Sequence, residues 1–141
     1  MPCVGGVVVH DGRLLLVRRG QEPGRGLWSV PGGRLEPGET VAEGCAREVL
    51  EETGLRVVPG ALVGTVERAA PDDSTYVIDD LDCAVARGVE LGHDGLPLLA
   101  AGDDADDAAW ASYDDLATLP LVPLLLETLD GWGVLQRLAG S

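Results

Sequence analysis

Three glutamates stand close together near the middle of the chain. Glu48, Glu51 and Glu52 are three and four residues apart, so on a helix their carboxylates share one broad face. Like charges at this spacing destabilise a helix unless a cation lies among them, and Arg47 can reach only Glu51 through an i,i+4 pair. Oxygen-only carboxylate clusters are the ligands that Mg²⁺ and Mn²⁺ prefer. The other interpretation, typical of an ordinary helix, is a solvated charged face.

The residues around this cluster predict a tight loop followed by a helix. The pair Gly32-Gly33 follows a short strand, which predicts a positive φ or a close approach of the backbone to another group. Thr40 with Glu43 matches a capping box, and Gly54 suits a left-handed C-cap. We therefore predict a helix from about Thr40 that ends at Gly54. Gly44 inside it costs about 1 kcal/mol relative to alanine, which we attribute to close packing against the sheet.

The rest of the chain alternates between strands and short helices without an internal repeat. This order predicts an α/β fold with a mixed sheet in a single domain spanning residues 1–141. Asp11-Gly12 between two aliphatic runs predicts a β-hairpin. Turn residues are expected at 31–38 and an acidic loop at 103–107. Further strands are expected at 61–68, at 75–86 with a bulge at Asp79-Asp80, and at 109–111, with helices at 114–119 and 123–129.

Composition excludes several classes of function. The net charge is −14, and the cations are ten arginines with no lysine and no basic cluster, so we expect no binding to nucleic acids or anionic membranes. Three cysteines without CxxC spacing indicate neither a disulfide framework nor a zinc site, and they favour the reducing cytoplasm. No signal peptide or membrane-spanning run is recognisable. The expected partner is a small molecule.

The spacing of the whole stretch carries more information than the glutamates alone. Gly33, five residues, Glu39, seven residues and then the run Arg47–Leu55 (R-E-V-L-E-E-T-G-L) resemble the Nudix hydrolase signature at every specified position. At ordinary residue frequencies this pattern arises by chance less than roughly once in 10⁸ windows. The resemblance implies an α/β/α sandwich with a mixed sheet and a signature that forms a loop–helix–loop. It also implies hydrolysis of a nucleoside diphosphate linked to another group.

The resemblance further implies roles for individual residues. The ligands of Mg²⁺ or Mn²⁺ would be the carboxylates of Glu48, Glu51 and Glu52 and the carbonyl of Gly33. Arg47 would orient a glutamate, and Glu39 would support the site. Bound cations would neutralise the pyrophosphate and lower the pKa of a bound water, and a carboxylate would take its proton. The candidates for this general base are Glu48, Glu52 and, in the later acidic loop, Asp103, Asp104, Asp106 and Asp107.

The substrate is less well defined by the sequence. Pro71 lies sixteen residues beyond Leu55, a placement that resembles the ADP-ribose pyrophosphatases, although proline is also an ordinary turn residue. The compact length instead resembles the MutT-like (d)NTP pyrophosphohydrolases. The absence of asparagine counts against a role in reading oxidised guanine. A third alternative, of another class, is a non-catalytic nucleotide-binding Nudix domain.

Four side chains outside the signature are candidates for binding the substrate. Arg18 and Arg19 end a predicted strand, where alternation of side chains would point one of them toward a site on the sheet. Trp28 and Tyr76 offer aromatic rings for stacking on a base, which is worth about 1–3 kcal/mol in other nucleotide sites. For both aromatic residues a place in the hydrophobic core is the competing interpretation.

Overall fold

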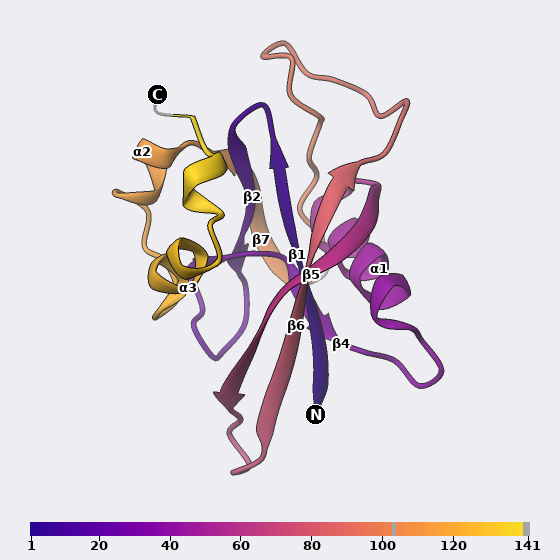
Figure 1. Cartoon of the computed structure of the whole chain (residues 1–141), viewed down its shortest axis with the longest axis vertical. Coiled ribbons are helices and arrows are strands. Elements are labelled where there is room, and N and C mark those ends of the chain that lie inside the picture. Colours follow the sequence, from indigo (N-terminus) through magenta and orange to yellow (C-terminus); the bar gives the residue numbers. More distant parts are fainter. Residues whose placement is uncertain (103, 140–141) are drawn as a thin grey trace.

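A mixed sheet of seven strands forms the centre of the computed structural model, which describes residues 1–102 and 104–139 (Figure 1). The strand order is β3-β2-β1-β6-β5, with β4 paired to β1 and β7 paired to β2. β1 and β6 run parallel, and the other pairs are antiparallel. The predicted α/β class with a mixed sheet is confirmed. The strands are β1 (Pro2–His10), β2 (Arg13–Arg19), β3 (Trp28–Ser29), β4 (Gly32–Arg34), β5 (Val57–Ala69), β6 (Thr75–Val85) and β7 (Ala105–Ala111).

Helices cover both faces of the sheet, and the strands supply a buried layer to each. Along β2, Leu15 packs in the cluster beneath α1 (Val41–Thr53), whereas Leu14 and Leu16 pack in the cluster on the opposite face. This alternation follows from the two-residue period of a strand. The opposite face is covered by α2 (Tyr113–Leu116), α3 (Leu125–Gly131) and the 3₁₀ turn η1 (Leu135–Arg137). Figure 1 shows α1 and α3 on opposite sides of the sheet. Within the described ranges, none of these helices has the length and hydropathy that a membrane span requires.

The local signals around α1 act as the sequence predicts. The Thr40 hydroxyl accepts from the Glu43 backbone N–H at 3.1 Å, and the Glu43 carboxylate accepts from the Thr40 N–H at 2.9 Å. Gly54 adopts φ 73° as the C-cap. The hairpin between β1 and β2 is also confirmed, because Asp11 and Gly12 both take positive φ and Val9 pairs with Leu14.

The sequence prediction for residues 31–38 was wrong in part. Gly32–Arg34 form β4, which pairs with Cys3–Gly5 of β1, and neither glycine has a positive φ. The close approach does hold, since a Cβ on Gly32 would lie 2.3 Å from the carbonyl oxygen of Val4. The glycines therefore allow the backbone of β4 to lie close to that of β1.

Other boundaries also differ from the prediction. The irregular register lies in β5, between Pro59 and Leu62 and between Leu62 and Gly64, and β6 runs through Asp79-Asp80 without a bulge. β7 begins at Ala105, so Asp106 and Asp107 belong to a strand and not to the acidic loop. α3 begins at Leu125, after Leu124 in a left-handed conformation, rather than at Pro123. Asp103 lies outside the described residues.

Gly44 is required by packing in α1. A Cβ at this position would lie 2.4 Å from Cδ2 of Leu35 and 3.0 Å from Oε1 of Glu39. The close neighbours are thus in the loop before α1, and Val4 of the sheet is 3.4 Å away. Close packing at Gly44 is confirmed, but the prediction that the sheet is the partner was wrong, because the loop before α1 lies nearer.

Gly44→Ala is therefore expected to lower the free energy of unfolding by about 1 kcal/mol, because overpacking outweighs the gain in helix propensity. Gly131→Ala in α3 is the matched control, since no atom lies within 4 Å of the added Cβ. This control should leave the free energy of unfolding unchanged or raise it slightly. Urea denaturation of both variants measures the difference, and a stabilised Gly44→Ala would contradict the packing role.

Asp80 is an unusual member of the interior. It is 5% exposed, and its Oδ1 has no hydrogen-bond partner among the residues that the structure describes. Burial raises the pKa of this carboxyl from 3.8 to about 6, against a smaller lowering effect of Arg68. The unfolded chain loses this proton near pH 3.8, whereas the folded protein keeps it until about pH 6, so stability falls as pH rises between these values.

Asp80→Asn should stabilise the protein on the order of 2 kcal/mol at pH 8, because the charged buried group is removed without a change of shape. At pH 4 the gain should be much smaller, since Asp80 is then neutral in the folded protein. Thermal or urea unfolding at the two pH values measures the difference. An equal effect at both would show that the charge of Asp80 is not the cause.

Candidate active site

The guanidinium of Arg47 is the centre of a network of carboxylates. Its Nε donates to Glu39 Oε2 at 2.6 Å, and Nη1 donates to Glu48 at 2.8 Å and to Glu51 at 3.2 Å. Nη2 donates to Glu39 Oε1 at 3.0 Å and to the carbonyl of Arg34 at 3.0 Å. Glu36 lies 3.7 Å from Nη1. One side chain of α1 thus connects its own helix to the preceding loop and to β4.

The contact with Arg47 fixes the charge state of Glu39. The bidentate hydrogen bond from Arg47, with a backbone N–H from Glu36, lowers the pKa of Glu39 to about 2. The same bonds raise the pKa of Arg47. Both groups are therefore charged at neutral pH. The structure thus ties Glu39, in the loop before α1, to Arg47 of the helix.

Glu52 occupies a different environment from its neighbours. Its Oε1 accepts from the Gly32 N–H at 2.9 Å, and no ion pair of Glu52 is found within the described residues. Burial raises its pKa to about 7, and the charge of Glu48 adds to this, while the Gly32 N–H and Arg19 act in the opposite direction. Glu52 is thus a half-buried carboxyl on which Arg19 acts through its charge, without an ion pair to any described residue.

Gly33 brings the backbone of β4 against Glu48. A Cβ on Gly33 would lie 2.6 Å from the Glu48 carboxylate carbon, so only glycine allows this approach. In the part of the chain that the structure describes, no group of three or more His, Cys, Asp or Glu side chains is arranged around a common point for a metal ion. The donors nonetheless fit Mg²⁺ or Mn²⁺ chemically, because they are oxygens with more negative charge than Arg47 can balance.

The loop that carries the later aspartates reaches the same site. The backbone N–H groups of Ala100 and Gly102 donate to the last carbonyls of α1, at Thr53 (2.8 Å) and Glu52 (3.3 Å). Asp104 follows, and its charge contributes to the raised pKa of Glu52. Gln21 Nε2 donates to Asp104 Oδ1 at 2.8 Å.

Gly20 contacts two of the predicted alternative bases, Asp104 and Asp106, and its lack of a side chain allows both to lie close to its backbone. Its N–H donates to the carbonyl of Asp104, and an added Cβ would lie 2.7 Å from Oδ1 of Asp106. The structure thus brings Asp104 near Glu52 and places Asp106 beside Gly20. The charge of Arg19 acts on Glu52, and its Nε donates a hydrogen bond to the carbonyl of Pro23 at 2.6 Å.

The predicted substrate-binding residues are in different surroundings. Trp28 is 7% exposed, packs in the core cluster on the α3 side, and has the Arg18 guanidinium carbon 6.0 Å from its ring centroid. This placement matches the core interpretation of Trp28. Tyr76 is partly exposed on β6, with the Arg34 guanidinium carbon 5.6 Å from its ring centroid and Arg34 Nη2 3.3 Å from its hydroxyl.

Sequence reasoning did not single out Gly20, Gln21, Arg34 or Asp80. Arg34 immediately follows the signature glycine, which was a signal for proximity to the site. Gly20 follows a strand that ends in two arginines, and a glycine there could have indicated a close approach. Asp80 gave no local signal, because its burial depends on pairing between β1, β5 and β6.

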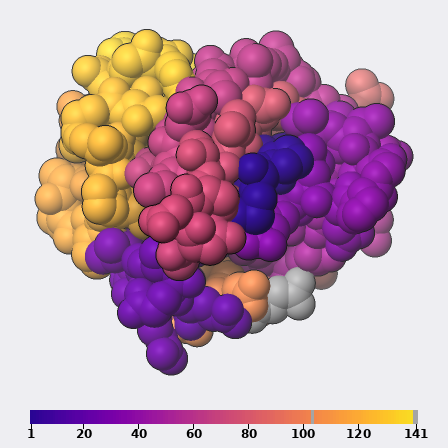
Figure 2. Space-filling view, turned by 90° about the horizontal axis from the view of Figure 1, so that it is seen from below, coloured from indigo at the N-terminus to yellow at the C-terminus, as the bar shows by residue number. Residues whose placement is uncertain are grey.

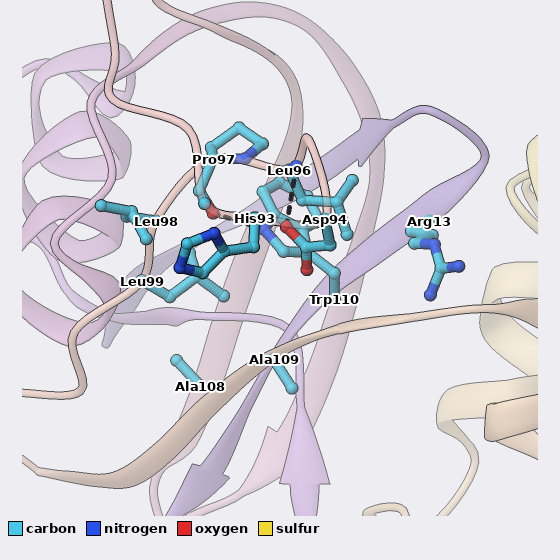
Figure 3. A pocket seen from close by; sticks show the side chains of 11 residues that line it. Arg13, His93, Asp94, Leu96, Pro97, Leu98, Leu99, Ala108, Ala109 and Trp110 are labelled. Atoms are coloured by element: carbon cyan, nitrogen blue, oxygen red, sulfur yellow. Dashed lines mark hydrogen bonds between the residues drawn. The ribbon is translucent and has the colours of Figure 1, made fainter.

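Two cavities lie away from the carboxylates. One of about 500 Å³ lies between β7 and the loop of residues 92–99, and Figure 3 shows Arg13 to one side, apart from His93 and Leu99. Trp110 lines this cavity and donates its indole N–H to the carbonyl of Pro97 at 2.9 Å. The second, of about 470 Å³, is lined by Arg56 and Arg87 beyond the C-cap of α1. Neither contains a signature carboxylate.

Fold and site together define an α/β/α protein whose loop–helix–loop carries a carboxylate network around one arginine. A family model described as "NUDIX domain" matches residues 1–130. The chain therefore belongs to the Nudix hydrolase family.

Individual relatives agree with this assignment. The chain is 36% identical over 118 residues to an "ADP-ribose pyrophosphatase" of Methanocaldococcus jannaschii, a match that covers 84% of this chain but 63% of that protein. It is 35% identical over 134 residues to a "MutT-like protein" of Streptomyces ambofaciens, covering 92% of this chain and 77% of the relative. A NUDIX hydrolase structure from Nitrosomonas europaea superposes with a TM-score of 0.74 at 27% identity, covering 97% of this chain and 90% of that one.

The electrostatics of the site can be measured in the metal-free protein. A ¹³C-detected NMR titration of the side-chain carboxyls should give Glu52 a midpoint near pH 7, with Glu39 remaining charged down to about pH 3. Arg47→Gln should move the pKa of Glu39 upward and leave that of Glu52 in place, because Arg47 is not among the groups that shift Glu52. A Glu52 midpoint near 4.5 in the parent protein would contradict the structure.

Proposed function

We propose that the chain is a Mg²⁺- or Mn²⁺-dependent pyrophosphohydrolase that acts on ADP-ribose or a similar nucleoside diphosphate derivative. The observation that carries this proposal is the intact set of signature carboxylates, of which Glu52 is half-buried and forms no ion pair with a described residue. A divalent cation is the partner that would relieve this excess of negative charge. The expected place of action is the cytoplasm, and the three cysteines are unpaired and buried, as that compartment permits.

The proposed division of roles follows from the contacts. Arg47 holds Glu48 and Glu51 in position, and Glu39 holds Arg47. Glu48, Glu51, Glu52 and the Gly33 carbonyl would hold the cations. When bound, the cations would neutralise the pyrophosphate and activate a water.

The remaining role is that of the general base. Glu52 is our first candidate, because a pKa near working pH suits a group that accepts and releases a proton. Asp104 is the alternative, since it reaches the same region from the other side. Asp106, beside Gly20, is the second alternative from that loop.

Two observations bear on the substrate. The relative from M. jannaschii is named an ADP-ribose pyrophosphatase, which supports the preferred substrate. The relative from S. ambofaciens is named MutT-like and is matched over a larger share of its length, which supports a (d)NTP as the second candidate.

A panel of ADP-ribose, NADH, nucleotide sugars, dinucleoside polyphosphates and (d)NTPs, assayed with Mg²⁺ and with Mn²⁺, tests the proposal. We expect turnover that EDTA abolishes, with the highest kcat/KM for ADP-ribose. Glu52→Gln should lower kcat at least about 100-fold, because it removes both a ligand and the candidate base. Glu67→Gln, at an exposed carboxylate of β5, is the matched control and should keep the parent activity.

The same assay separates the alternatives. If Asp104→Asn costs as much as Glu52→Gln and also removes the lower limb of the pH–rate profile, Asp104 is the base. If no substrate is turned over while nucleotide binding persists in both parent and Glu52→Gln, the chain is a binding domain and the proposal fails.

A further inference from the structure

Two arginines flank one tyrosine on the face of the sheet opposite α1. Arg34 of β4 stacks on Tyr76 with its guanidinium carbon 5.6 Å from the ring centroid, and its Nη2 donates to the phenol oxygen at 3.3 Å. Arg68 of β5 is the direct cross-strand partner of Tyr76. Partners in register share a face, so Arg68 lies on the side of Tyr76 away from Arg34. We call Arg34, Tyr76 and Arg68 the arginine–tyrosine row.

Neither cation of the row forms an ion pair with a described carboxylate, although the charge of Arg68 acts on the buried Asp80. Among the described residues, ion pairs within 4.0 Å are formed by Arg47 and Arg137 only. Arg68 Nη1 donates to the neutral carbonyl of Pro123 at 3.2 Å. Asp72 is a carboxylate that interacts electrostatically with Arg34, but its Oδ1 accepts a hydrogen bond from the backbone N–H of Ser74 at 3.1 Å. In a chain of net charge −14, two cations are thus held in place by neutral groups.

The row adjoins the carboxylate site. Gly33 faces Glu48, and successive residues of a strand point to opposite faces, so Arg34 projects to the other side of β4. The carbonyl of Arg34 accepts from Arg47 Nη2 at 3.0 Å, which fixes the backbone of this residue to the network. Figure 2 shows this end of the molecule, with the indigo N-terminal residues at the surface between the pink β5–β6 hairpin and the purple segment that follows β4.

We propose that the arginine–tyrosine row binds a phosphate group of the nucleotide substrate, on the side of β4 that the signature carboxylates do not reach. Guanidinium groups match phosphate oxygens in a bidentate geometry, and Tyr76 keeps the Arg34 fork oriented before the ligand arrives. The row then determines the affinity for the nucleotide, while the carboxylates carry out the chemistry. This inference rests on the proposed function for its substrate and adds the residues that hold it.

Steady-state kinetics on the best substrate of the panel test the row. Arg34→Gln and Arg68→Gln should each raise KM about tenfold with kcat changed less than about twofold, since a charged hydrogen bond to phosphate is lost. Arg87→Gln is the control, because it makes the same change in net charge at an exposed residue beyond the opposite end of β6 from Tyr76 and should leave KM unchanged. Arg68→Lys should recover part of the affinity. Melting temperatures of all variants identify any loss of folding at the Pro123 contact.

A second measurement is independent of turnover. Binding of ADP to the parent protein in EDTA, followed by NMR or calorimetry, should weaken with rising salt and should weaken at least fivefold in Arg34→Gln, but not in Arg87→Gln. Equal affinity in both variants, or unchanged KM in both row variants, would overturn the role of the row while leaving the hydrolase intact. ADP binding that depends on Arg34 in a protein that hydrolyses nothing would support the row and reject the enzyme.

Discussion

The active-site end of the molecule depends on a single guanidinium that is shared by four carboxylates. Arg47 binds Glu39, Glu48 and Glu51 directly, with Glu36 close by, and it also reaches the backbone of β4. One positive charge among four negative ones fixes positions without balancing charge. Because Arg47, Glu39 and Glu48 are only partly exposed, the negative charge of these two carboxylates is less screened than that of the exposed Glu36 and Glu51. The carboxylates are thus held in fixed positions and carry an excess of negative charge, and both properties favour the binding of small cations.

The loop between β6 and β7 is also held in place by α1, on the far side of the site. Ala100 and Gly102 bond to the last carbonyls of α1, and the chain then leads directly to Asp104. The position of the acidic loop is therefore set by the same helix that carries Glu48 and Glu52. A change in the length of this loop would move Asp104 relative to Glu52 even if every signature residue stayed in place.

Features encoded by neighbouring residues could be predicted from the sequence, and features that depend on distant pairing could not. The capping box at Thr40, the Gly54 C-cap and the Asp11-Gly12 hairpin are determined within a few residues, and all are found. β4 was missed because two glycines are poor strand formers, and their pairing with β1 is a long-range contact. Of the arginine–tyrosine row, Tyr76 was predicted as a substrate-binding residue, whereas Arg34 and Arg68 were not singled out. Arg34 meets Tyr76 only through the long-range pairing of β4 and β6 with β1. The bulge was predicted in β6, whereas the irregular positions lie in β5.

Those irregular positions have a consequence for how the protein behaves in concentrated solution. β5 ends the sheet order, and Val58 and Leu62 on it are 59% and 57% exposed, so this strand could template pairing with a second copy. Two breaks of register and Pro59 interrupt the straight run of backbone groups that such pairing requires. Mutual repulsion of strongly negative molecules adds a second barrier, and it disappears near the isoelectric point of about 4.2. Near that pH, resistance to self-association therefore depends on the irregular backbone of β5.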